Sequence, residues 1–411
     1  MNKIINIYKD SFKGLNKDVF VFALMMLINR VGTLILPFLT LYTTQQLGWT
    51  KIDAGTATMW FGLGSLAGSY LGGEMTAKIG YYKTMAFSLF SAAICFYFLQ
   101  FVTEFYMFCG FLFISSTLAD LIRPALWAGI TYFTNKENQT RSVSLLRMAF
   151  NAGIAIGPAI AGTLIEKYGY GLIFTIDGLT CFAAGVFLLV FVKNKKEKKE
   201  EEIVQEEIGI SPYKDVLFMT FMGLCMIMLI SFFQILFTVP LFMNEVLGLS
   251  EKEVGYFFTA NGLLILLTEL PIVYYMENYY SKFKSMIIGA VMIGISVLAF
   301  IFPLPSLFML IFYTFFVSIG EIINFPFISS SSMDRASKGN MGKYMGVNTM
   351  MFSLSLIIAP IFGTAILDKY GYSVLFFVLF LLCVISVIGL YLIEQRFVSL
   401  RSDLKLNQVK S

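Results

Sequence analysis

Two stretches of the sequence match each other. Residues 158–174 read PAIAGTLIEKYGYGLIF, and residues 360–376 read PIFGTAILDKYGYSVLF. A shift of 202 residues places EKYGY, which begins at Glu166, on DKYGY, which begins at Asp368. Shared hydrophobicity alone does not align these motifs, so the chain consists of two related halves. Two copies oriented alike are typical of transporters with a pseudo-twofold axis along the membrane normal.

The composition places both halves in a membrane. The chain has 411 residues, of which 57% are hydrophobic and 14% charged, with a mean hydropathy of +0.76. Apolar runs long enough to cross a bilayer as helices recur from residues 19–41 to residues 374–393, and we count twelve. The sequence therefore predicts an all-α membrane protein with twelve transmembrane helices in two pseudo-symmetric six-helix bundles.

A charged stretch separates the bundles. KNKKEKKEEEIVQEEIGISPY has a block of Lys followed by a block of Glu, which is typical of a solvated connector. We predict a first bundle over residues 1–193, a cytoplasmic linker over 194–214, a second bundle over 215–395 and a cytoplasmic tail over 396–411.

The distribution of Lys and Arg predicts the orientation. Short basic loops stay on the cytoplasmic side, and most basic residues fall on the side of the amino terminus. We expect a multi-pass protein of the cell inner membrane with both termini cytoplasmic. The net charge of +4 reports this topology and gives no reason to expect nucleic acid. The expected partners are the lipid bilayer and a small-molecule substrate, and we expect a monomer.

The chain has no histidine and no cysteine spacing typical of a metal site. Without a soluble domain to shield chemistry, these features argue against an enzyme and against a bound metal or cofactor.

Ionisable residues at membrane depth are candidates for function, because each costs about 2.5–3.5 kcal/mol on insertion scales. We expect them to face the bundle interior and to compensate one another. Seven qualify: Arg30, Asp120, Arg123, Arg147, Asp177, Glu269 and Glu321.

Arg30 lies close to the middle of the first span, too deep to reach water easily. It is either a counter-charge to an anionic substrate group or proton-carrying carboxylate, or a member of a structural ion pair. Asp120 and Arg123 are three residues apart and share a helix face, so they either satisfy each other or take part in coupling. Glu321, followed by Asn324, is a candidate proton carrier.

For two of the remaining charges, Glu269 and Asp177, we favour structural roles. Glu269 and Asp177 fall on less central helices. Arg147 and Asn151 are four apart at the cytoplasmic start of the fifth span and could hold an inner gate or contact headgroups.

Two motifs resemble signatures of a known family. RMAFNAGIAIGPAIAGTL, residues 147–164, is similar to the glycine-proline signature of drug:proton antiporters of the major facilitator superfamily. GEMTAKIGYYK, residues 73–83, resembles the cytoplasmic loop signature of that superfamily, although Ala77 replaces the usual acidic residue. Glu277 is the acidic residue at the equivalent position of the second half. The resemblance implies gating roles for these residues: Gly73, Lys78, Gly80, Lys83, Arg147, Asn151, Gly153, Gly157, Pro158, Gly162 and Glu277.

A third stretch, DLIRPALWAGITYF, residues 120–133, places Arg123 where such antiporters carry a basic residue. We expect Glu321 and Asp120 to carry protons. We also expect four residues to bind substrate or tune charge: Arg30, Arg123, Trp127 and Asn324. The resemblance implies the major facilitator fold and alternating access. It also implies export of small amphipathic molecules, driven by the proton gradient without a cofactor. A proton-coupled uptake symporter for a sugar, amino acid or peptide is the alternative.

Overall fold

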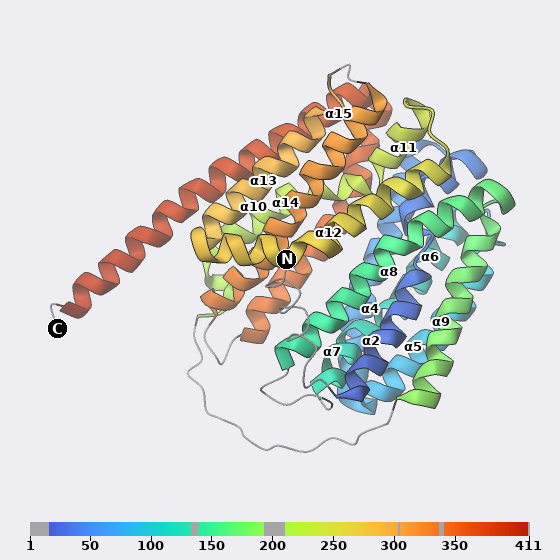
Figure 1. Cartoon of the computed structure of the whole chain (residues 1–411), viewed down its shortest axis with the longest axis horizontal. Helices are drawn as coiled ribbons and strands as arrows, with labels where there is room; N and C mark the ends of the chain where they lie inside the picture. The colour runs from blue at the N-terminus through green and yellow to red at the C-terminus, as the bar shows by residue number, and fades with distance from the viewer. Residues whose placement is uncertain are drawn as a thin grey trace, which may run out of the picture. The chain divides into compact units, whose positions relative to one another are not determined.

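The structure is a computed structural model that describes residues 16–131, 133, 139–192, 210–302, 305–336 and 341–409. These residues form helices joined by short connections, and no strand occurs among them. The predicted all-α class is confirmed. The chain divides into two compact units (Figure 1). Unit 1 comprises Met1–Glu201 with Met243–Leu266, and unit 2 comprises Glu202–Phe242 with Leu267–Ser411.

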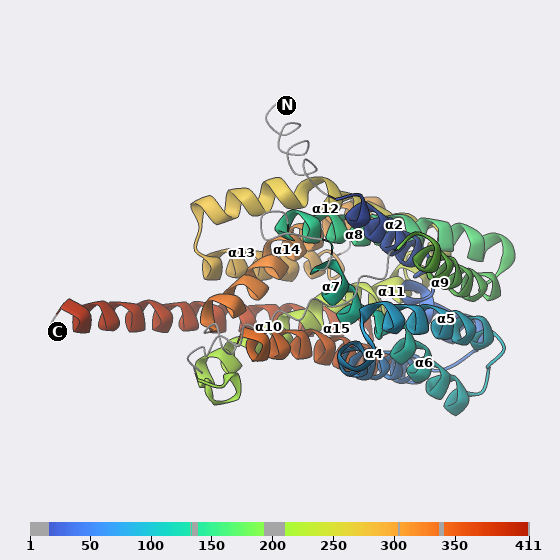
Figure 2. The ribbon, with the colours of Figure 1, turned by 90° about the horizontal axis from the view of Figure 1, so that it is seen from below.

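Unit 1 is built on three long helix pairs. In it α2 packs along α8, α4 along α6 and α5 along α9 (Figure 2). Its helices are α2 (Lys17–Val31), η1 (Leu36–Phe38), α3 (Leu39–Leu41), η2 (Tyr42–Gln46), α4 (Lys51–Ile79), α5 (Tyr81–Leu99), α6 (Phe105–Asp120), α7 (Ile122–Thr131), α8 (Gln139–Tyr168) and α9 (Gly171–Phe191).

Local sequence explains where α4 begins and ends. Thr50 caps its start, because the Thr50 hydroxyl accepts a hydrogen bond from the Asp53 amide at 3.1 Å. Gly80 ends the helix at φ 83°, a conformation that favours glycine. The helix is thus fixed at both ends by residues suited to those positions.

Unit 2 repeats this arrangement in part, because α10 and α13 both pack along α15. A positive φ at Gly371 divides α15 into two helical parts. The helices of the second half are η3 (Pro212–Lys214), α10 (Val216–Phe232), η4 (Phe233–Ile235), α11 (Thr238–Glu245), α12 (Glu251–Tyr279), α13 (Lys282–Leu298), α14 (Ser306–Arg335) and α15 (Met341–Val409).

Membrane spans can be recognised by the length and composition of the helices. In the described chain eight helices are long and apolar enough to cross a membrane, or nine if the bent pair Glu251–Glu269 and Pro271–Tyr279 is one span. These helices establish a multi-pass membrane protein. The count of twelve stays a prediction.

The first helix of each half is interrupted. In the first half α2 ends at Val31, and the chain resumes helical structure at Leu36. We call residues 32–35 the helix-1 break. In the second half α10 ends at Phe232 and a short 3-10 turn leads to α11 at Thr238. We call residues 233–237 the helix-7 break.

Candidate transport site

Arg30 lies at the end of α2, beside the helix-1 break. Its side chain is buried, and the guanidinium carbon stacks 4.7 Å from the centre of the Phe150 ring. The Arg30 Nε has no hydrogen-bond partner among the described residues, although Asp120 and Arg123 lie within electrostatic range. The expected ion pair is therefore absent from the described structure. A cation–π contact, which needs no opposite charge, takes its place.

Asp120 and Arg123 form the pair that their spacing predicts. Arg123 Nε lies 2.8 Å from Asp120 Oδ1, and the buried carboxylate also accepts a hydrogen bond from the Ser65 hydroxyl of α4. The Arg123 side chain is 45% exposed, whereas the Asp120 side chain is 7% exposed. The carboxylate is thus held by two elements while its cationic partner stays accessible.

Asp177 is buried on α9 and forms no salt bridge among the described residues. Its two carboxylate oxygens instead accept hydrogen bonds from the backbone amides of Leu34 and Ile35, at 2.9 and 3.2 Å. These amides belong to the helix-1 break. The side chain therefore satisfies backbone groups that an interrupted helix leaves free, in agreement with the expected structural role.

The candidate residues of the second half lie on α14. Glu321 is partly buried near the middle of that helix, and Glu269 of α12 lies within electrostatic range of it. Asn324 is fully buried, and its amide donates to the Gly320 carbonyl at 2.9 Å while packing against Gly289 of α13. This position gives Asn324 a packing contact between two helices and no open face toward a substrate.

The glycine-proline signature lies on α8, where its glycines contact both α2 and α12. Gly153 and Gly157 pack against the backbone of α2 next to Arg30. Further along, a Cβ on Gly162 would lie 2.3 Å from the Glu251 carbonyl oxygen of α12. Pro158 is buried between these positions. Small residues of this kind let helices approach closely. On α8 they allow close contact with α2 and with α12.

The segment 243–266 packs on α8 for the same reason. A Cβ on Gly255 would lie 2.3 Å from the Pro158 carbonyl oxygen, and one on Gly262 would lie 2.6 Å from the Cα of Ala155. Backbone therefore meets backbone along this contact, which we call the α8–α12 seam. It explains why a segment of the second half belongs to unit 1.

Polar residues surround one end of the seam. Lys51 pairs with Glu245 at 2.7 Å and Lys252 with Glu166 at 3.5 Å. The Tyr170 hydroxyl lies 3.3 Å from a Glu251 carboxylate oxygen. Burial, together with the Glu251 charge, raises the pKa of Tyr170 above its usual range, so Tyr170 remains a donor. We call these residues, with Gln45 and Asn244, the seam cluster.

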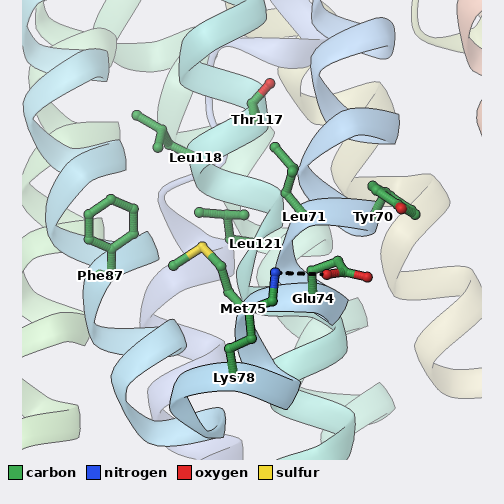
Figure 3. Close-up of a pocket in the computed structure, with 9 residues that line it drawn as sticks. All are labelled: Tyr70, Leu71, Glu74, Met75, Lys78, Phe87, Thr117, Leu118 and Leu121. Carbon is green, nitrogen blue, oxygen red and sulfur yellow. Dashed lines mark ion pairs between the residues drawn. The ribbon is translucent and has the colours of Figure 1, made fainter.

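The loop signature surrounds the end of α4. Lys78 pairs with Glu74 one turn earlier, at 3.1 Å, so an acidic partner is supplied although Ala77 is not acidic. The pair lies beside a cavity of about 390 Å³ that is lined mostly by apolar side chains, among them Leu118 and Leu121. Figure 3 shows the pair and these side chains. Lys78 is therefore held within its own helix.

The remaining gating and binding candidates are less constrained. Gly73 has open space around it, Gly80 terminates α4, and Lys83 and Glu277 are exposed. Trp127 is 45% exposed on α7. Asn151 is partly buried on α8. The side chain of Arg147 lies outside the described residues.

Sequence reasoning missed a glycine ladder on α4. A Cβ on Gly64, Gly68 or Gly72 would lie 2.0–2.5 Å from atoms of α6 or of Leu121. The spacing of four was visible in the sequence and is the usual signal for close helix packing.

A second missed feature is the contact of Asp215 with α14 and α15. Arg335 donates from Nε and Nη2 to the Asp215 carboxylate at 2.7 and 3.1 Å, and the Tyr344 hydroxyl donates at 3.0 Å. Burial alone would raise the pKa of Asp215, but these hydrogen bonds and that of the Phe218 amide lower it overall. The partners are more than a hundred residues away, so no local pattern could reveal them.

Relatives of known name support a transporter. YttB of Bacillus subtilis, named as an MFS-type transporter, is 22% identical over 95% of this chain and 98% of its own. The multidrug resistance protein MdtH of Aeromonas hydrophila is 25% identical over 81% of this chain and 83% of its own.

Solved structures share the fold. A POT family transporter in complex with 5-aminolevulinic acid superposes with a TM-score of 0.76 at 16% identity, covering 93% of this chain and 96% of its own. The nucleoside transporter NupG gives 0.76 at 12% identity, covering 92% and 99%. The family model of the Major Facilitator Superfamily matches residues 19–257 and 224–406. The chain therefore belongs to the major facilitator superfamily of membrane transporters, and it has that fold.

Proposed function

We propose that this transporter exports small amphipathic molecules in exchange for protons, by alternating access. The observation that carries the proposal is Glu321, a partly buried carboxylate near the middle of α14 that forms no salt bridge among the described residues. A carboxylate in that setting can be neutral or charged without a fixed counter-ion, which a proton carrier requires.

Asp120 is the second candidate for the proton site. It is buried in unit 1 with Arg123 and Ser65 as partners, and Arg30 lies within electrostatic range. A proton on Asp120 would remove the charge that holds Arg123, so binding of a proton would free a cationic group beside an accessible space.

The names of the relatives favour export. Two relatives from different bacteria, Aeromonas hydrophila and Blochmanniella floridana, are named multidrug resistance protein MdtH. The structural neighbours are named as POT family and nucleoside transporters, but at their identities they support the fold alone. Proton-coupled uptake of a sugar, amino acid or peptide is the second candidate.

A transport assay separates the two. We expect everted membrane vesicles containing the protein to accumulate an amphipathic dye such as ethidium when their lumen is acidified, and to release it when the gradient is collapsed. Accumulation of a dipeptide, amino acid or sugar in right-side-out vesicles, with no movement of dyes, would overturn export.

Glu321→Gln tests the proton site. We expect it to abolish gradient-driven transport while leaving exchange of substrate across the membrane measurable, because exchange does not require net proton release. Asp368→Asn, at an exposed carboxylate of α15, is the control. Equal loss of both activities in Glu321→Gln would assign that residue a structural role. We further propose the inner membrane as the location, with both termini cytoplasmic.

A further inference from the structure

The helix-1 break is closed by a side chain from another helix. The amides of Leu34 and Ile35 do not reach the carbonyls of Arg30 and Val31, which a continuous helix would offer them. They donate instead to the two oxygens of Asp177 at 2.9 and 3.2 Å. One carboxylate thus takes the place of two helical acceptors.

The surface of α9 fits the break beyond this contact. A Cβ on Gly32 would lie 1.6 Å from the Thr180 hydroxyl oxygen, so only glycine allows α9 to lie this close. Asn29 donates to the sulfur of Cys181, one turn after Asp177 on α9, at 3.5 Å. The helix-1 break is therefore packed closely against α9 within unit 1.

The corresponding break in the second half uses a neutral side chain. Gln234 donates from Nε2 to the Ala359 carbonyl of α15 at 2.8 Å, and it accepts from the Thr238 hydroxyl at 2.8 Å. A neutral amide thus joins the helix-7 break to α15, from within the break and as a donor. The carboxylate of Asp177 differs from this amide because it carries a charge that a proton can remove.

We propose that Asp177 is a positioning residue that couples a proton to the geometry of the helix-1 break. Ionised, it has two acceptor oxygens and holds both amides. Protonated, the carboxyl is neutral and one of its oxygens carries a hydrogen, so its hydrogen bonds to the two amides lose their charge assistance and weaken. The two amides can leave an ionised Asp177 only at the high cost of a buried charge without partners.

Among the groups that surround Asp177, the amides of Leu34 and Ile35 are the ones whose hydrogen bonds depend on its charge. Cys181 lies within electrostatic range of both Asp177 and Arg30. From α5, the Ala93 carbonyl and the Tyr97 backbone pack against Gly178. From α8, Gly153 and Gly157 contact α2 through its backbone near Arg30. Since Arg30 lies one residue before the end of α2, loosening the break moves the anchor of the Arg30 side chain.

The inference is independent of the proposed direction and substrate, and amide hydrogen exchange tests it directly. The purified protein in detergent is exchanged at acidic and at alkaline pH, and rates are normalised to the unfolded peptide. We expect protection of Leu34 and Ile35 to fall by about tenfold or more at acidic pH, the effect of losing one charge-assisted hydrogen bond. The amides of the helix-7 break in the same sample are the matched control, and their protection should not change.

Asp177→Asn supplies the second test. Its side chain has one acceptor oxygen and carries no charge at any pH, so we expect the lower protection of Leu34 and Ile35 at both pH values. Two results would overturn the proposal: wild-type protection that stays constant or rises at acidic pH, or a pH dependence that survives in Asp177→Asn. The wild-type measurement decides the question even if the variant does not fold.

Discussion

An alanine at position 255 is expected to force the α8–α12 seam apart. Its methyl carbon would lie 2.3 Å from the Pro158 carbonyl oxygen, whereas ordinary contact begins at 3.4 Å. The next nearest atoms, Pro158 C and Ala159 Cα, are also backbone, so no change of rotamer relieves the clash. The helices must separate by about 1 Å locally.

The cost of that separation sets the expected effect. Overpacking of a close contact typically costs about 1–3 kcal/mol. This cost applies only to the conformation in which the seam is closed, so Gly255→Ala shifts the equilibrium away from that conformation by about 5- to 150-fold. We expect the seam to be open in a larger fraction of molecules and the transport cycle to be biased accordingly.

A zero-length carbodiimide cross-link between Lys252 and Glu166 measures the closed seam, because their charged atoms lie 3.5 Å apart. Mass spectrometry of the digest should show a yield lowered by at least several-fold in Gly255→Ala. Gly110→Ala, at a helical glycine with open space around it, is the matched control. The Lys78–Glu74 link within α4 should be unchanged in both variants. An unaltered Lys252–Glu166 yield in Gly255→Ala would refute the reasoning.

Three further outcomes are expected. Arg30→Lys keeps the charge but loses the planar stack on Phe150, so substrate transport should fall at unchanged expression; normal transport would exclude a role for the planar group. Asp215 has a lowered pKa in the fold, so its stabilising effect is complete above its unfolded value and is lost as the pH falls through the folded value. The thermal midpoint should therefore drop on the acid side, below about pH 4, more in the wild type than in Asp215→Asn; equal slopes would count against the Arg335 contact. Gly68→Leu should prevent α4 from packing on α6, whose backbone lies 2.3 Å from the position of a Cβ, and a monodisperse variant of wild-type thermal stability would contradict this.

Patterns that act within one helix or repeat through the chain were readable from the sequence. The internal repeat and the apolar runs predicted the fold, and the spacing of Asp120 and Arg123 predicted their contact. Asp177 was assigned a structural role because its helix is peripheral. These inferences need only local geometry or duplication.

Contacts between distant residues were not readable. Ser65 reaches Asp120 across 55 positions, and the amides held by Asp177 are 142 and 143 positions away. The expectation that buried charges neutralise one another was wrong for Asp177, which backbone amides satisfy. Among the described residues Arg30 likewise forms no salt bridge; it stacks on the Phe150 ring, and Asp120 lies within electrostatic range. Neither arrangement has a sequence signature.

The seam cluster has a consequence for how the transporter responds to ionic strength. Its lysine and glutamate side chains are 28–41% exposed, so dissolved salt screens their attraction and each pair contributes little. The glycine contacts beneath them involve no charge and are insensitive to salt. Raising the salt concentration should therefore change how fast the ends of these helices meet, while leaving the proportion of molecules with the helices in contact nearly constant.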